Sequence, residues 1–101
     1  MPHFCCYCRD RPDSAAIRAE MFSAHIAHIE ASLDRYLIAG PLKQGDLTVG
    51  SMLVVKAEDA AAARVFLEQD PYFAAGLWDS IVIDQFLGVA GDWVGGAAWK
   101  K

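Results

Sequence analysis

The stretch FSAHIAHIEASLDRY, residues 22–36, carries the strongest periodic signal of the chain. Its large apolar side chains recur at intervals of three or four residues: Phe22, Ile26, Ile29, Leu33 and Tyr36. At ~100° per residue they form a stripe ~80° wide on one side of an α-helix. Asp13 or Ser14 can cap this helix, and no glycine or proline follows before Tyr36. We therefore expect a helix from there to about Tyr36, with the stripe packed against the rest of the fold.

Four short runs rich in apolar residues are typical of β-strands, and they lie at residues 3–9, 36–39, 50–57 and 78–86. A second helix is expected from Glu58 or Asp59 to Gln69, and it ends there because a residue before Pro71 is pushed away from helical geometry. The order is therefore β-α-β-β-α-β. This order predicts a ferredoxin-like α+β fold, with two helices on one face of a four-stranded antiparallel sheet.

Both faces of the predicted sheet are apolar. Within residues 78–86, the side chains that alternate between the two faces are Ile81 and Ile83 on one side and Trp78, Val82 and Phe86 on the other. Residues 52–55 alternate in the same way between apolar side chains. The helices can cover only one of the two faces. We therefore expect a homodimer in which a second sheet stacks on the uncovered face.

Composition excludes several classes of partner. The 101 residues are enough for one small domain, and nine Lys and Arg against thirteen Asp and Glu give a net charge of −4. Without a basic cluster we expect no nucleic-acid partner and no anionic membrane surface. No apolar run approaches the ~18 residues of a spanning helix. The start of the chain lacks the features of a signal peptide, so we expect a cytoplasmic protein.

Residues 88–101 follow the domain that we expect at residues 1–87, and they have no clear period. This C-terminal tail contains Trp93 and Trp99, whose large apolar rings are costly to leave in water. Two interpretations stay open. The tryptophans anchor the tail to the body or to a partner subunit, or the tail is frayed.

The cysteines have a spacing that is familiar from redox and zinc sites, since Cys5 and Cys8 form a C-x-x-C pair. In a strand, however, residues three apart point to opposite faces, so these two cannot share a metal or a disulfide. We expect inert, reduced thiols. His25 and His28 with an acidic residue are a weaker alternative for a metal. No second short-spaced pair completes such a set, and we expect no metal and no cofactor.

Two residues are candidates for acid–base chemistry. His25 lies ~60° from Phe22 on the helix, at the edge of the apolar stripe, whereas His28 lies ~120° away, on the solvated side. Asp70 precedes Pro71 at the end of the second helix, and two aromatic residues follow it. A carboxylate in such a setting can pair with an imidazole. The sequence leaves open whether His25 and Asp70 meet or serve only as a packed histidine and a solvated turn carboxylate.

Three short motifs resemble the YciI-like (YCII-related) family of the dimeric α/β-barrel superfamily, over about residues 3–87. They are AHIAHI at 24–29, AGP at 39–41, and DPY at 70–72 followed by AG at 75–76. The resemblance implies a ferredoxin-like subunit, a dimer whose sheets form a barrel, and an acid–base pair at His25 and Asp70. Arg18 matches a basic residue often found in the family. The chain departs from some relatives at Phe22, where they carry an arginine, and its tail has no recognised counterpart.

Some related proteins are lyases or isomerases of small cyclic or aromatic compounds. The hypothesis is therefore a cofactor-free enzyme in which His25 is the general base and Asp70 orients its ring. The residues expected to bind a small substrate are Arg18, as an anion contact, and Tyr36, Tyr72 and Phe73, as pocket walls. The alternative is a non-catalytic dimeric module that binds a small ligand or serves a larger assembly.

Overall fold

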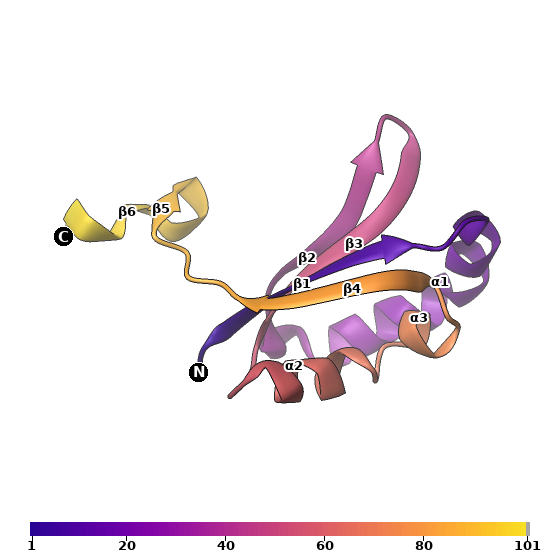
Figure 1. Ribbon diagram of the computed structural model, residues 1–101, viewed down its shortest axis with the longest axis horizontal. Coiled ribbons are helices and arrows are strands. Elements are labelled where there is room, and N and C mark those ends of the chain that lie inside the picture. Colours follow the sequence, from indigo (N-terminus) through magenta and orange to yellow (C-terminus); the bar gives the residue numbers. More distant parts are fainter. Residues whose placement is uncertain (101) are drawn as a thin grey trace.

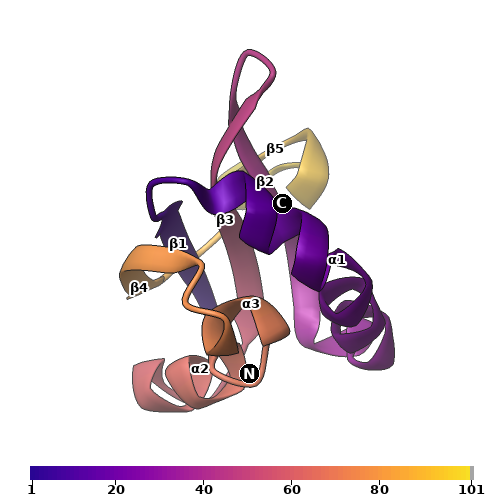
Figure 2. The ribbon, with the colours of Figure 1, turned by 90° about the vertical axis from the view of Figure 1, so that its right-hand side faces the viewer.

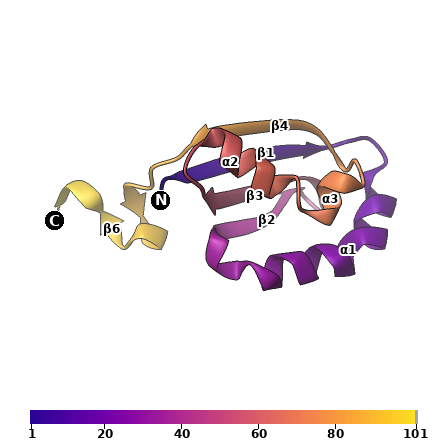
Figure 3. The ribbon, with the colours of Figure 1, turned by 90° about the horizontal axis from the view of Figure 1, so that it is seen from below.

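The computed structural model describes residues 1–100, and it confirms the ferredoxin-like α+β fold (Figure 1). The main sheet is antiparallel with strand order β2-β3-β1-β4, and its strands are β1 (His3–Asp10), β2 (Tyr36–Gln44), β3 (Leu47–Lys56) and β4 (Trp78–Gln85). All three α-helices lie on one face of it (Figure 3): α1 (Ser14–Ala31), α2 (Ala60–Leu67) and α3 (Pro71–Ala74). Within residues 1–100, no helix has the length and apolar character needed to cross a membrane.

The hydrophobic core lies between the helices and the sheet. Alternate side chains of β1 and β3 enter the core from the sheet, and α2 closes it on the opposite side. The buried residues include Phe4, Cys6, Cys8, Leu53, Val55, Ala63, Phe66 and Leu67. Burial raises the pKa of Cys6 to about 11 and that of Cys8 to about 12, so both thiols are neutral near pH 7. Cys5 lies on the other face, and all three cysteines are free. The predicted separation of Cys5 from Cys8 is confirmed.

Helix α1 ends five residues before the predicted end at Tyr36. The hydroxyl of Ser32 donates to the carbonyl oxygen of His28 over 2.9 Å, and the chain then tightens into a 3₁₀ turn at Leu33–Arg35. A serine that bonds the preceding turn in this way competes with the regular helix. Tyr36 therefore begins β2 instead of continuing the helix.

The apolar stripe of α1 packs against the core only in part. Phe22 is 56% exposed, and α1 buries no residue completely. The side chains of α1 that pack against the core are Ile17, Met21 and Ile29, of which only Ile29 belongs to the predicted stripe. His28 was predicted on the solvated side, but it is half-buried, with its ring centroid 6.0 Å from that of Phe66. This face of α1 carries both polar and apolar side chains, and the apolar periodicity alone therefore did not predict the position of His28.

Strands β2, β3 and β4 also differ from prediction, and β3 begins at Leu47, three residues before the predicted start. β2 does not end at Gly40-Pro41 but runs on to Gln44, and Pro41 is tolerated because β2 is an edge strand that needs fewer N–H donors. β2 and β3 form a long hairpin that projects from the body (Figures 1 and 2). Simple alternation with Val82 predicts that Trp78 lies on the sheet face opposite the helices. A register shift in the pairing of β4 with Arg9 and Asp10 turns Trp78 onto the helix-facing side, where it joins the core.

Gly50 of β3 lies directly against the backbone of β1. A Cβ atom at this position would collide with the carbonyl oxygen of Cys8 and would lie 3.0 Å from the side chain of Leu42. Gly40, on edge strand β2, has open space within 4 Å of the corresponding Cβ position.

We therefore expect Gly50→Ala to destabilise the protein by about 1–3 kcal/mol, since backbone atoms must shift to admit the methyl group. Gly40→Ala is the matched control and is expected to change the free energy of unfolding by less than about 0.5 kcal/mol. Urea unfolding of both variants measures the difference. Equal stabilities would show that β1 and β3 are farther apart at this position than described.

Candidate functional site

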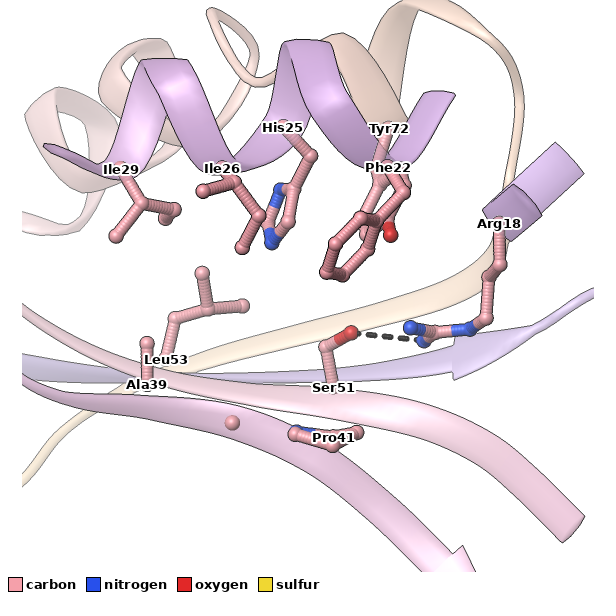
Figure 4. A pocket seen from close by; sticks show the side chains of 11 residues that line it. Arg18, Phe22, His25, Ile26, Ile29, Ala39, Pro41, Ser51, Leu53 and Tyr72 are labelled. Carbon is pink, nitrogen blue, oxygen red and sulfur yellow. Dashed lines mark hydrogen bonds between the residues drawn. The ribbon is translucent and has the colours of Figure 1, made fainter. Parts of the chain in front are cut away.

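A cavity of about 210 Å³ lies between α1, α3 and the helix-facing side of the sheet (Figure 4). Helix α1 supplies one wall, strands β2 and β3 supply the floor, and Tyr72 of α3 completes the lining. The lining residues are Arg18, Phe22, His25, Ile26, Ile29, Ala39, Gly40, Pro41, Ser51, Leu53 and Tyr72. Most of the surface that they present is apolar, and the polar groups are concentrated near Arg18 and His25.

The structure brings His25 and Asp70 together. The imidazole Nδ1 lies 2.9 and 3.0 Å from the two carboxylate oxygens of Asp70. Asp70 is the N-cap of α3, and its Oδ1 also accepts a hydrogen bond of 2.9 Å from the backbone N–H of Tyr72. Pro71 at the first helical position is typical of such a start. The local sequence Asp-Pro-Tyr thus fixes the carboxylate, which is 1% exposed, directly behind the histidine.

The ring of His25 is held in one orientation. It stacks on the ring of Tyr72, with centroids 3.9 Å apart and planes inclined by 12°. Since a carboxylate accepts hydrogen bonds, we assign the proton of the neutral ring to Nδ1, which leaves the lone pair on Nε2. Figure 4 shows this second ring nitrogen pointing into the cavity. A histidine that is oriented in this way can accept a proton from a bound molecule.

Arg18 forms the second polar cluster. Its Nε and Nη2 donate to the two oxygens of Asp10 over 2.7 and 2.9 Å, and Nη2 also lies 2.9 Å from the Gly50 carbonyl oxygen and from Ser51 Oγ. The side chain of Asp10 is almost fully buried. Arg18 therefore lies at the cavity, but Asp10 already balances its charge.

Asp10 and Ser51 are site residues that the sequence did not reveal. In the sequence, Asp10 directly follows the predicted strand at residues 3–9, and Ser51 lies within the predicted strand at residues 50–57. Ser51 Oγ also accepts a hydrogen bond of 3.3 Å from the indole N–H of Trp78, so it joins Arg18 to the core. Neither residue belongs to a motif or a periodic pattern, and only the fold brings them beside Arg18.

The three predicted aromatic wall residues have different positions. Tyr72 lines the cavity, and burial raises the pKa of its phenol although Arg18 acts in the opposite direction. Tyr36 lies outside the lining, where its ring packs 5.3 Å from that of Phe66 and its hydroxyl lies 3.5 Å from His28 Nε2. Phe73 packs against the core from outside the cavity, below the guanidinium of Arg64.

His25 and His28 do not combine into a metal site. His28 does not line the cavity, and the Nδ1 of His25 is already paired with Asp70. In the part of the chain that the structure describes, no three His, Cys, Asp or Glu side chains lie close enough together to hold a metal ion.

The fold and the site together define a small ferredoxin-like α+β protein in which a buried carboxylate supports an imidazole at a cavity. Residues 2–87 match the YCII-related domain, and the chain belongs to that family, within the dimeric α/β-barrel superfamily. Two bacterial relatives, both named Protein YciI, come from Escherichia coli O6:H1 and Shigella flexneri. Each is 30% identical over 89 residues, covering 79% of this chain and 91% of the relative.

A solved structure is also similar to this chain over most of its length. It is 5-chloro-2-hydroxyhydroquinone dehydrochlorinase (TftG) from Burkholderia phenoliruptrix AC1100, in complex with 2,5-dihydroxybenzoquinone. The two chains share 27% sequence identity with a TM-score of 0.78, and the match covers 89% of this chain and 96% of that chain.

The position of the His25 proton gives a direct test of the pair. In Asp70→Asn the amide oxygen is expected to keep the N–H of Tyr72, so the amide NH₂ faces Nδ1 as a donor. We therefore expect the ring proton of His25 to move to Nε2, which removes the lone pair from the cavity. Nitrogen-15 chemical shifts of the neutral rings report the tautomer, and His28, which does not contact Asp70, is the internal control. An unchanged His25 tautomer would show that Asp70 does not select it.

Proposed function

We propose that this protein is a cofactor-free lyase or isomerase that moves a proton on a small hydroxylated ring compound. The observation that carries the proposal is the pairing of His25 Nδ1 with Asp70 at 2.9 and 3.0 Å, with the second ring nitrogen directed into a cavity. This is the arrangement by which a carboxylate orients a histidine base and stabilises its protonated form.

The proposed reaction begins with a ring hydroxyl close to His25 Nε2. The imidazole accepts the hydroxyl proton, and the electron pair left on the oxygen forms a carbonyl. In an isomerase the imidazolium returns the proton to a ring carbon. In a lyase the proton goes to the ring carbon that bears the leaving group, which makes this carbon tetrahedral. A second ring hydroxyl then gives up its proton, its electron pair forms a second carbonyl through the ring double bonds, and the anionic leaving group departs from the tetrahedral carbon with its own electron pair, so that one proton and one anion are lost in total. In both cases the buried Asp70 carboxylate balances the charge that develops on His25.

The walls of the cavity support a flat, uncharged ring as substrate. Phe22, Ile26 and Pro41 are apolar and line the space beside the His25–Tyr72 stack. The charge of Arg18 is balanced by Asp10, and Phe22 adds no charge of its own. A strongly anionic substrate would therefore meet the negative charge of Asp70 without a free cation to offset it. The dihydroxybenzoquinone bound to TftG is likewise a flat, hydroxylated six-membered ring.

The proposal predicts a specific loss of turnover on removing the base. We expect His25→Gln to lower kcat for 5-chloro-2-hydroxyhydroquinone by about 10²–10⁴-fold, the usual contribution of a general base, with KM changed much less. His28→Gln removes a histidine of the same helix that does not line the cavity, and it should retain most of the activity. Release of chloride measures the rate.

One outcome would contradict the enzymatic function, and another would contradict the role of His25. If the unmodified protein binds 2,5-dihydroxybenzoquinone but releases no chloride from the chlorinated substrate and isomerises no related hydroxylated ring, the cavity belongs to a binding module. If His25→Gln retains full turnover, proton transfer by His25 is wrong even though the protein is an enzyme.

We also propose that the working form is a homodimer that is joined through the sheet face opposite the helices. This face carries large apolar side chains that are uncovered in one chain, since Tyr7, Leu37 and Val82 are each at least two-fifths exposed. Stacking a second sheet on it would bury these side chains, as in other face-to-face sheet pairs.

The dimer predicts a mass of about twice 11.0 kDa in solution. Light scattering at micromolar concentration measures this mass. A well-folded protein that remains at 11.0 kDa over the whole accessible concentration range would contradict the proposal.

A further inference from the structure

A second and larger cavity, of about 680 Å³, lies on the face of the sheet opposite the helices. Its two walls come from different parts of the chain. The sheet and its flanking residues supply His3, Cys5, Leu37, Ile38, Met52 and Val54, and the C-terminal tail supplies Phe86, Leu87, Gly88, Trp93 and Val94. We call this space the tail groove. It shares no residue with the cavity at His25.

The tail forms an arm that leaves the body of the molecule. After β4 the chain enters a small hairpin of β5 (Ala90–Gly91) and β6 (Gly96–Ala97), which Figures 1 and 3 show beyond the end of the sheet. Trp93, in the 3₁₀ turn between these strands, borders the tail groove yet is 81% exposed. Trp99 is 71% exposed. The tail therefore does not bury its own large side chains against its own sheet.

The chemistry of the tail groove fits a protein surface better than a polar ligand. His3 is the one titratable side chain other than the Cys5 thiol among its lining residues, so a charged ligand would find no paired group there. The groove is also wide, with the sheet on one side and the arm on the other. Stacked sheets are spaced by about 10 Å, so the layer that naturally occupies such a space is a second apolar sheet face.

A second copy of this chain presents that sheet face. In a two-fold arrangement each copy places its own uncovered face in the tail groove of the other, so that one contact is made twice. Phe86, Trp93 and Trp99 from both chains would then bury on the order of 1,000 Å² by themselves. That area is a large part of the roughly 1,600 Å² of a standard stable interface.

We propose that residues 86–100 form a clasp that closes over a second copy of this chain, with Trp93 as its apolar anchor. The clasp adds to the sheet-face dimer proposed above, and it makes each tail part of the other subunit's surface. It is independent of the chemistry at His25, because the tail groove and the catalytic cavity lie on opposite faces of the sheet.

The test is the effect of Trp93 on dimer dissociation, measured by sedimentation velocity on the full chain. Trp93→Ser is expected to raise the dissociation constant by about tenfold or more, as for other buried aromatic anchors. Trp93→Phe, which keeps most of the apolar area, should restore most of the affinity. Val65→Ser is the matched control, because Val65 is 57% exposed on α2, on the other side of the molecule. Circular dichroism verifies that each variant is folded.

A second measurement on the unmodified protein shows which chain Trp93 contacts. Chains with ¹³C-labelled methionine methyl groups are mixed with unlabelled chains, and NOEs are filtered for contacts between labelled and unlabelled copies. The clasp predicts such a contact between the Trp93 ring and the methyl group of Met52 in the other chain. The proposal is overturned if that contact is found only within one chain, or if Trp93→Ser leaves the dissociation constant unchanged. Loss of activity in His25→Gln bears on neither result.

Discussion

The buried carboxylate of Asp70 is the constraint on which the site depends. An unpaired charge at 1% exposure would cost several kcal/mol, so the fold must supply partners for both oxygens. The N–H of Tyr72 and the Nδ1–H of His25 are those partners. Because one belongs to α3 and the other to α1, satisfying the carboxylate fixes these helices relative to each other. The cavity lies where their side chains and the sheet leave space.

Helix α1 is consequently held in place by polar contacts in addition to the apolar packing of Ile17, Met21 and Ile29. Arg18 and His25 are seven residues apart, about two helical turns, and therefore project from the same side. Arg18 pairs with Asp10 of β1 and reaches Gly50 and Ser51 of β3, while His25 pairs with Asp70. This explains why α1 has no fully buried residue although it covers much of the sheet. Its neighbour α2, which docks with Ala63, Phe66 and Leu67, is held in the usual apolar way.

The order of the elements could be predicted from the sequence because it follows from apolar runs, caps and prolines, which act locally. The errors arose where one side chain altered the backbone. Ser32 shortened α1, and the irregularity in β4 turned Trp78 inward. The tail was predicted without regular structure, and its small hairpin has strands of only two residues, too short for an alternating pattern to show.

The site was predictable to a different degree at each residue. His25 and Asp70 were singled out by their settings and by the family motifs, but their contact spans 45 positions and only the fold establishes it. Asp10 and Ser51 carried no signal, because a carboxylate after a strand and a serine within one are ordinary. Tyr36 and Phe73 are close in sequence to residues that line the cavity, but their own side chains pack against other parts of the core. An aromatic residue close to a motif in the sequence therefore need not line the cavity that the motif forms.

The edge position of β2 has an evolutionary consequence. The paired His25 and Asp70 come from α1 and from the start of α3, whereas Ala39, Gly40 and Pro41 of the cavity floor belong to a strand with a neighbour on one side only. Side chains on such a strand can change in size with little effect on the core or on the pairing of His25 with Asp70. Selection for a differently shaped ligand can therefore act on these three positions while His25 and Asp70 stay constant. A library of variants at these three positions alone would change which ligands the cavity prefers while the rest of the fold stays the same.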